Sequence, residues 1–289
     1  MKSGIGRLSG KNVVITAGYG DIGRATCQRF CEEGARVFMT GRKKQKDGEA
    51  IAAETEKLAH AAHIASLKSL GVPKAQPNGS ISYMMCDAGD RASIEAMLDS
   101  VVKSNGRIDV VIGNAAMVEN GPFLKIRPDQ WQAHLDLNLT GQFHLGQAAA
   151  HLMVEQEPRK RPGCNRGVRG KILFNSSWVQ DMPWPEGCCY GVSKAGLQLM
   201  AKAMALELAI YGIRVNIVAP GIILAGLSKT CYETDPNFGP RATGAIPLRE
   251  FGTPEQCADA FLFFAGDESD YITGISLLVD GGASLPRRD

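Results

Sequence analysis

A tyrosine and a lysine four residues apart, Tyr190 and Lys194 in the segment YGVSK, are suited by type and spacing to proton transfer. On a helix this spacing places the phenol and the ammonium on one face, about 6 Å apart at the backbone. A free phenol has a pKa of about 10, and a neighbouring cation favours the phenolate and lowers that pKa. The same pair also occurs by chance on helix surfaces, with both side chains reaching into solvent.

The helix that carries this pair is expected to pack on a sheet. Its face continues as an apolar stripe at helical spacing: Leu197, Ala201, Met204 and Leu208. The polar first turn of the helix then lies at the end of the sheet. Open α/β sheets bind their ligands in the crevice beyond the carboxyl ends of the strands, which makes a purely structural role for Tyr190 and Lys194 the weaker interpretation.

Short apolar runs alternate with longer helical segments along the chain. Seven of them are predicted to be strands: 12–16, 36–39, 81–85, 109–112, 171–174, 214–218 and 275–279. Strands interleaved with helices form βαβ units, because a parallel crossover needs a helix to return the chain. With 289 residues and 44% hydrophobic composition, one large core is possible. We predict an α/β fold: a single doubly wound Rossmann domain over 1–289, with a seven-stranded parallel sheet and helices on both faces.

The first predicted strand runs into a glycine-rich turn, TAGYGDIG at 16–23, and then into a helix. This order places backbone N–H groups and the positive end of a helix dipole against a pyrophosphate. Glycine-rich turns of this kind also serve packing alone, so the turn by itself favours a dinucleotide only weakly.

The end of the second predicted strand bears on the choice of cofactor. In a dinucleotide fold an acidic residue about 20 positions after the turn binds the adenosine ribose hydroxyls, and this chain has none there. The segment MTGRKK at 39–44 offers room at Gly41 and three cations, of which Arg42 suits a 2′-phosphate through its planar fork. We therefore predict NADP(H) in preference to NAD(H), and the alternative is that these cations only begin a solvated helix.

Segment 16–23 resembles the pattern TGxxxGxG of the short-chain dehydrogenase/reductase (SDR) family, with Ala17 and Asp21 where the pattern has its first two glycines. Further segments resemble the classical SDR family over nearly the whole chain: GNAA at 113–116, NLTG at 138–141, NSS at 175–177, YGVSK at 190–194, IRVN at 213–216, PG at 220–221 and VDGG at 279–282. Ala225 stands where many relatives have threonine.

The resemblance implies hydride transfer between a nicotinamide cofactor and a secondary alcohol or ketone. In that reaction Tyr190 moves the hydroxyl proton, Ser177 steadies the oxygen, Lys194 binds the nicotinamide ribose and Asn138 holds a relay water. The cofactor-binding residues that it implies are Thr16, Gly18, Gly20, Asp21, Ile22, Gly23, Arg42, Asp87, Asn114, Tyr190, Lys194, Pro220, Gly221 and Ile223. An asparagine inside a helix is unfavourable by up to ~0.7 kcal/mol relative to alanine, so we expect a helix distortion or a buried amide contact at Asn138.

Three segments are expected to decide the substrate: the loops 118–122 and 178–187, and a lid at 222–251. Trp178 and Trp184, beside Asp181 and Glu186, favour a sugar or polyol by stacking and hydrogen bonding. The same tryptophans are also compatible with a pocket for an apolar ketone of steroid or 3-oxoacyl type. An NADP-binding regulator that has lost catalysis is the alternative from another class, and the complete reacting set argues against it.

Composition excludes several partners. The net charge of +2, from 32 basic and 30 acidic residues, gives no broad footprint for nucleic acid. No secretory leader or run of about 18 apolar residues is present, which predicts a cytoplasmic protein without a membrane span. The eight cysteines form no CxxC pair or zinc-ligand spacing, so no metal is expected. The expected partners are a small alcohol or ketone and, as the resemblance implies, further copies in a homotetramer or homodimer.

Two segments look like additions to the fold: 43–80, which contains an extended helix, and the Arg-, Pro- and Gly-rich 157–170. We expect both on the surface, the second as a solvated loop or, alternatively, a basic interaction patch. Cys27 and Cys31 have helical spacing and are expected in the core. Cys188 and Cys189, near a helix N-terminus, raise the hypothesis of oxidative inhibition, with inert wall residues as the alternative.

Overall fold

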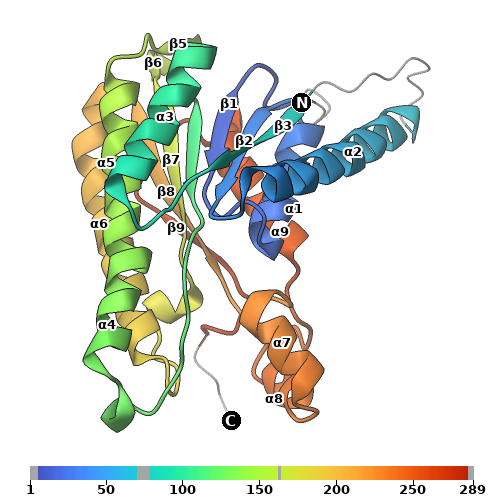
Figure 1. Cartoon of the computed structure of the whole chain (residues 1–289), viewed down its shortest axis with the longest axis vertical. Coiled ribbons are helices and arrows are strands. Elements are labelled where there is room, and N and C mark those ends of the chain that lie inside the picture. Colours follow the sequence, from blue (N-terminus) through green and yellow to red (C-terminus); the bar gives the residue numbers. More distant parts are fainter. Residues whose placement is uncertain (1–5, 70–78, 162–163, 286–289) are drawn as a thin grey trace.

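The computed structural model describes residues 6–69, 79–161 and 164–285. Seven parallel strands form one sheet in the order β3-β2-β1-β4-β7-β8-β9 (Figure 1). They are β1 (Asn12–Ile15), β2 (Arg36–Gly41), β3 (Ser80–Met85), β4 (Val110–Gly113), β7 (Gly170–Asn175), β8 (Ile213–Pro220) and β9 (Ser276–Val279). All seven predicted runs are strands of this sheet, so the predicted doubly wound fold is confirmed.

Helices cover both faces of the sheet. One face carries α1 (Asp21–Glu32), α2 (Gln45–Ser69) and α9 (Pro254–Ala265), and the other carries α3 (Arg91–Asn105), α5 (Gly141–Val154) and α6 (Cys188–Leu208) (Figure 1). Because successive side chains of a strand point to opposite faces, Val14 joins the core under α5 and α6, whereas Val13 and Ile15 join the core under α1 and α9. Burial on both faces explains why these strands are almost continuously apolar.

The strand order reverses between β1 and β4, which are neighbours in the middle of the sheet: β2 and β3 lie on one side of β1, and β7, β8 and β9 lie on the other side of β4. The chain therefore leaves their carboxyl ends in opposite directions and opens a crevice between them. Ile15 ends β1, Gly113 ends β4 and Asn175 ends β7, so the segments that follow these three residues meet at one edge of the sheet.

A helical lobe lies beyond the carboxyl end of β8, where the sequence predicts a lid at 222–251. It contains α7 (Gly226–Thr234) and α8 (Phe238–Gly244) (Figure 1). Its base is closed by a backbone hydrogen bond of 2.9 Å from Leu224 N to Gly252 O. Inside it, the rings of Phe238 and Phe251 stack with their centroids 6.1 Å apart.

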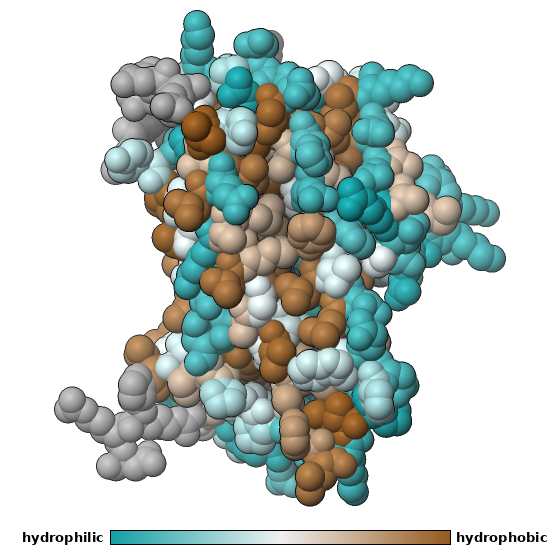
Figure 2. Space-filling view, turned by 90° about the vertical axis from the view of Figure 1, so that its left-hand side faces the viewer, coloured by the Kyte–Doolittle hydropathy of each residue, from teal (hydrophilic) through white to brown (hydrophobic). Residues whose placement is uncertain are grey.

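Apolar side chains gather along the middle of the face on which α5 and α6 lie (Figure 2). Leu199 and Leu206 on α6 are 70% and 82% exposed, and Phe143 on α5 is 40% exposed. No helix within residues 6–69, 79–161 and 164–285 combines the length and apolar composition needed to cross a membrane.

The two additions differ from each other in the structure. Segment 43–80 contains the predicted extended helix, α2, of 25 residues, and its Pro-rich part at 70–78 lies outside the described residues. Within segment 157–170, β5 (Arg159–Arg161) and β6 (Cys164–Val168) pair antiparallel, so the prediction of a solvated loop is wrong for these residues.

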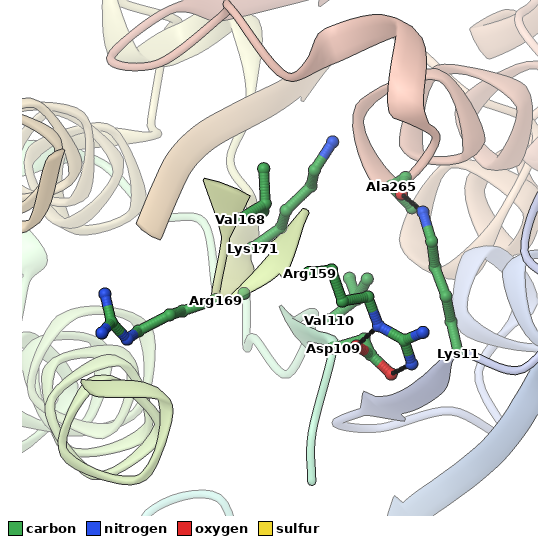
Figure 3. A pocket seen from close by; sticks show the side chains of 9 residues that line it. Lys11, Asp109, Val110, Arg159, Val168, Arg169, Lys171 and Ala265 are labelled. Atoms are coloured by element: carbon green, nitrogen blue, oxygen red, sulfur yellow. Dashed lines mark hydrogen bonds and ion pairs between the residues drawn. The ribbon is translucent and has the colours of Figure 1, made fainter. Parts of the chain in front are cut away.

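The buried carboxylate of Asp109 binds a side chain of the β5–β6 hairpin and so holds the hairpin against the sheet. Arg159 donates to both oxygens of Asp109, at 2.7 and 3.0 Å, and Figure 3 shows the two groups facing each other at the amino end of the sheet. Asp109 is 5% exposed, and Arg107 also donates to it. Because Arg159 is engaged in this contact, it stabilises the fold and is not part of an open basic patch.

Candidate active site

Tyr190 and Lys194 lie in the first turns of α6, where the helix reaches the carboxyl end of the sheet. The ammonium nitrogen of Lys194 is 5.4 Å from the centroid of the Tyr190 ring. Lys194 is 1% exposed, and its Nζ donates a hydrogen bond of 2.8 Å to the carbonyl oxygen of Asn175 at the end of β7. The two groups predicted from their spacing therefore do lie together.

Burial sets the protonation of this pair. Desolvation raises the pKa of Tyr190 to about 12, against the opposite effect of its hydrogen bond with Ser177. Desolvation also lowers the pKa of Lys194 to about 7. The expectation that Lys194 would lower the pKa of the phenol is wrong, because the shift of Tyr190 is dominated by burial of the phenol, which raises its pKa. At neutral pH Tyr190 is a protonated phenol, ready to donate.

Ser177 lies two residues beyond the end of β7 and beside Tyr190. It is 7% exposed, has extended backbone and begins a short 3-10 turn, Trp178–Gln180. Its Oγ accepts a long hydrogen bond of 3.4 Å from Val179 N. The Ser177 hydroxyl therefore binds the backbone just beyond the strand, as expected for a structural serine. It also contacts the phenol of Tyr190, as expected for a catalytic serine.

Asn138 shows both features expected of an asparagine inside a helix. It lies in a π turn, Asp136–Thr140, between α4 (Pro128–Leu135) and α5, and its side chain is fully buried. Its Oδ1 accepts from Met117 N at 2.8 Å, and its Nδ2 donates to Met117 O and to Ser193 Oγ. Because both amide hydrogens are used by the protein, the side chain ties Met117 to α6.

A cavity of about 450 Å³ opens at the carboxyl ends of the strands. Many residues singled out from the sequence line it: Gly20, Asp21, Ile22, Gly23, Asn114, Ser177, Tyr190, Pro220, Gly221 and Ile223. Others lie behind its wall or away from it: Thr16, Gly18, Arg42, Asp87, Asn138 and Lys194. The cavity is thus lined by the glycine-rich turn, by Ser177 and Tyr190, and by the lobe at 222–251.

The glycine-rich turn fits a pyrophosphate. The first N–H groups of a helix have no partner within it, and the first turn of α1 lines the cavity. A Cβ at Gly23 would lie 2.5 Å from Ala17 O, so only glycine lets α1 approach the turn this closely. Ala17 has φ +48°, in the left-handed region, which explains why the family pattern has glycine there.

Asp21 bonds to the lobe instead of capping α1. Its Oδ2 accepts a hydrogen bond of 2.8 Å from Gly226 N at the start of α7. The N-cap residue of α1 is Gly20, and no side chain caps the helix. The carboxylate that replaces a glycine of the family pattern is therefore turned toward the lobe and held there.

Thr16 and Asn114 brace the floor of the cavity. The Oγ1 of Thr16 accepts from Asn114 N at 2.9 Å and from Ala115 N at 3.1 Å. The amide of Asn114 donates to Thr16 O and Ala17 O, and its Oδ1 accepts from Asn175 Nδ2 at 2.8 Å. These bonds fix the ends of β1, β4 and β7 relative to one another.

The end of β2 offers an exposed cationic site. Arg42 is exposed, and no hydrogen bond or ion pair holds its guanidinium among the described residues. Next to it, the Nζ of Lys43 lies 5.1 Å from the centroid of the Tyr19 ring, which covers Gly41 closely. Asp87, in contrast, closes a turn, since its Oδ1 accepts from Gly89 N at 2.9 Å.

A second cavity of about 370 Å³ lies on the other side of Trp184. Asp181 and Glu186 line this cavity and not the one that contains Tyr190. Trp184 lines both, and its ring packs on Trp178 with the centroids 5.3 Å apart. The tryptophans and carboxylates that favour a polyol in the sequence are thus divided between two cavities.

The cysteines behave mainly as apolar residues. Cys27 and Cys31 are 0% and 1% exposed, and desolvation raises the pKa of both thiols, which confirms their place in the core. Desolvation also raises the pKa of Cys189, the opposite of an activated thiol. Cys188 lines the second cavity. Within the described ranges, no group of three or more His, Cys, Asp or Glu side chains is arranged to hold a metal ion.

Sequence reasoning missed a row of buried polar side chains behind the cavity wall. Gln130, His134 and Gln142 are at most 5% exposed and share with Asn138 a spacing of four residues. That spacing is the signal that was available, because residues four apart lie on one face of a helix. Four polar residues on the inward face of one helix are unusual, since an unpaired buried polar group is costly.

The chain is similar to known proteins over nearly its whole length. Residues 17–284 match a family described as enoyl-(acyl carrier protein) reductase. The chain is 33% identical over 280 residues to a 3alpha-hydroxysteroid dehydrogenase of Mediterraneibacter gnavus, covering 96% of this chain and 98% of that protein. It is 32% identical over 279 residues to a glucose 1-dehydrogenase of Gluconobacter oxydans, covering 96% and 94%. A solved short-chain type dehydrogenase/reductase from Mycobacterium marinum is similar, with a TM-score of 0.77 and 30% identity over 96% of this chain and 97% of that one.

A parallel sheet with a nucleotide crevice and a tyrosine–lysine pair at its edge defines an oxidoreductase of the Rossmann type. With these likenesses over nearly its whole length, the chain belongs to the short-chain dehydrogenase/reductase family. It is an NAD(P)-dependent oxidoreductase that interconverts an alcohol and a ketone.

Proposed function

We propose that this oxidoreductase uses Tyr190 as its proton donor and acceptor and works with NADP(H) on a secondary alcohol or ketone whose non-reacting part is mainly apolar. One observation carries the proposal: the Ser177 and Tyr190 side chains line the same cavity as the first turn of α1. A nicotinamide bound there supplies or accepts the hydride.

Each residue of the reacting set has a role that follows from its position. The phenol of Tyr190 is protonated at neutral pH and gives its proton to the oxygen of a ketone. Ser177 holds that oxygen through its hydroxyl, which already contacts the phenol. Lys194 is anchored on Asn175 O and presents its amine to the ribose next to the nicotinamide. Asn138 fixes Met117 and Ser193, and so holds the wall behind Tyr190 in place.

The binding groups for the dinucleotide are the first turn of α1 for the pyrophosphate and the end of β2 for the adenosine. Gly20, Ile22 and Gly23 offer backbone at the helix N-terminus. Pro220, Gly221 and Ile223 form the wall on the side of the lobe. A side chain at Gly221 would collide with the backbone of Asp280, so this close approach also requires glycine.

Arg42→Ala should raise the KM for NADP about tenfold or more and leave the KM for NAD unchanged within about twofold. The physical reason is the loss of a charge-assisted hydrogen bond to the 2′-phosphate, which only NADP carries, worth about 1.5–3 kcal/mol. Steady-state kinetics with both cofactors on the wild type and the variant measure the effect. Arg36→Ala, an arginine at the other end of β2, is the matched control. An unchanged KM for NADP in Arg42→Ala would refute the assignment.

The walls around Tyr190 favour an apolar substrate over the polyol predicted from the sequence. The large apolar side chains of the lining include Val118, Trp178, Val179, Trp184, Ile222, Leu227 and Phe238. The two carboxylates that would bind sugar hydroxyls, Asp181 and Glu186, face the second cavity.

Initial rates on a steroid, a sugar and an acyl thioester test the substrate class. We expect a 3-hydroxysteroid and a 3-oxoacyl thioester to exceed glucose in kcat/KM by at least tenfold, because glucose would leave polar hydroxyls unpaired against apolar walls. The reaction is followed at the absorbance of the reduced nicotinamide. Preference for glucose would reverse the assignment and restore the polyol.

We also propose that 222–251 is a substrate lid within a single catalytic domain, and that the chain forms a homodimer or homotetramer. The lid is supported by its position over the cavity, which Leu227 and Phe238 line. Self-association is supported by the apolar side chains exposed along α5 and α6 (Figure 2).

A further inference from the structure

The wall of the cavity at 115–121 alternates strictly between residues that line it and residues that are tied down behind it. Ala116, Val118 and Asn120 line the cavity. The backbone of the residues between them is bound by side chains of the neighbouring helix. An extended chain places successive residues on opposite sides, so every second residue can face a ligand while the others are anchored.

The side chains that bind this backbone are Gln130, His134, Asn138 and Gln142, spaced four residues apart along α4, the π turn and α5. Gln142 Nε2 donates to Ala115 O at 2.7 Å, and Asn138 bonds to both backbone groups of Met117. Four residues of helix advance by about 6 Å and two residues of extended chain by about 6.6 Å, so the two spacings stay in step. The π turn at 136–140 adds a residue to one turn, which offsets the drift of about 40° that a four-residue spacing accumulates per step on an α-helix.

Two side chains of α4 bond to the backbone N–H and C=O of Glu119. Glu119 N donates to His134 Nε2 at 3.1 Å, and Gln130 Nε2 donates to Glu119 O at 3.2 Å. Because Nε2 of His134 accepts this hydrogen bond, its Nδ1 carries the proton and donates to Gln130 O at 2.8 Å. His134 is 0% exposed, so it makes these two bonds without competition from water. Gly121 N, the next anchor, donates to Glu186 O at 2.9 Å.

Asn120 lies between the two bound residues, Glu119 and Gly121. It is exposed in the cavity, and its amide makes no hydrogen bond to any other residue of the part of the chain that the structure describes. Its neighbours on the wall, Ala116 and Val118, are apolar. Asn120 is therefore placed to give a substrate one directed polar contact on an otherwise apolar wall.

We propose that His134 and Gln130 are positioning residues that set substrate selectivity by holding Asn120 in the cavity, where its amide binds a polar group at the non-reacting end of an otherwise apolar substrate. This inference rests on the proposed function, since it takes the reacting end to lie at Tyr190. It concerns the affinity for the distal end of the substrate, and the chemistry at Tyr190 is independent of it.

Two substitutions at His134 separate its two hydrogen bonds. Glutamine has a polar atom near the position of Nε2 and keeps an acceptor for Glu119 N, whereas asparagine has one near Nδ1 and keeps only the bond to Gln130 O. We expect His134→Asn to raise KM about tenfold for a substrate with a distal polar group, the effect of one hydrogen bond, and His134→Gln to restore KM to within about threefold of wild type. Gln132→Ala, on the exposed face of α4, is the control.

The probes are 3α-hydroxy-5α-androstan-17-one and 5α-androstan-3α-ol, which lacks the distal carbonyl; if neither reacts, the acyl thioester that reacts best and its chain-shortened analogue replace them. His134→Asn and Asn120→Ala should each raise KM for the probe with the distal group and not for the other. The double variant should be no worse than either single one, because both act through the same contact. Equal effects on both probes, or additive effects, would overturn the proposal.

Amide hydrogen exchange gives a readout that needs no substrate. The amide of Glu119 should exchange about tenfold faster or more in His134→Asn than in wild type and should stay protected in His134→Gln. Equal exchange in the two variants would show that His134 does not hold this wall. A failure of the proposed function would appear elsewhere, as full activity of Tyr190→Phe, with the exchange results unaffected.

Discussion

Tyr190→Phe is expected to lower kcat by a factor of about 10²–10⁴, the usual contribution of a general acid or base. Phenylalanine has the same ring and loses only the hydroxyl, so the packing of α6 and the shape of the cavity are kept. Binding of the nicotinamide dinucleotide should therefore stay within about threefold of wild type, because the phenol contributes at most one hydrogen bond to it.

The measurement combines kcat in both reaction directions with a fluorescence titration of NADPH. Tyr271→Phe, at a fully exposed tyrosine far from the reacting pair in sequence, is the control and should behave as wild type. Retention of more than about a tenth of the activity in Tyr190→Phe would exclude the phenol as the proton donor, since general acid catalysis is worth at least about 10²-fold.

Lys194→Met is expected to abolish most activity and yet to stabilise the fold at neutral pH. Activity should fall about 100-fold or more, because the amine proposed to bind the ribose is lost from beside the phenol of Tyr190. Stability should rise by about 1–3 kcal/mol, because methionine fills a similar volume without a buried ammonium, and this gain exceeds the loss of one hydrogen bond to Asn175 O.

The stabilisation should depend on pH in a defined direction. Burial lowers the pKa of Lys194 from 10.5 in the unfolded chain to about 7 in the folded protein. Below about pH 7 the amine is charged in both states and the folded protein bears the full penalty. Between about pH 7 and 10.5 the unfolded chain binds more protons, so the stability of the wild type rises with pH. The advantage of Lys194→Met should therefore shrink over this range.

Denaturant unfolding at pH 6.5 and 9.5 measures both effects, and Lys202→Met on the exposed side of the same helix is the control. A constant difference between wild type and Lys194→Met at the two pH values would show that the lysine does not change its protonation in this range. A less stable variant at both values would show that the lysine side chain is a net stabilising group whether or not it is charged.

Local sequence patterns predicted the sheet because its strands are buried on both faces. The centres of these runs, such as 110–112 and 172–174, are apolar throughout, and the runs are separated by segments long enough for a helix. The hairpin of β5 and β6 could not be predicted in this way. Its sequence has no alternation of apolar and polar residues, and it is held by Arg159, which reaches Asp109 fifty positions earlier in the chain.

Site residues that belong to a short sequence motif could be predicted. Properties that depend on burial, or on the direction in which a side chain points, could not. Ser177 and Tyr190 follow short patterns, and the structure brings them together. The pKa of Tyr190 moves opposite to the expectation because burial is a property of the folded state. Asp181 is three residues from Trp184, yet adjacency in sequence does not determine which cavity a side chain enters.

The hydrogen bond between Asp21 and Gly226 connects the two ends of the catalytic crevice across 205 positions of the chain. Outward movement of α7 must break it, and so must any dinucleotide that turns the carboxylate aside. If the lobe closes over the substrate as proposed, any factor by which the bound dinucleotide changes the affinity for the substrate is also the factor by which the substrate changes the affinity for the dinucleotide.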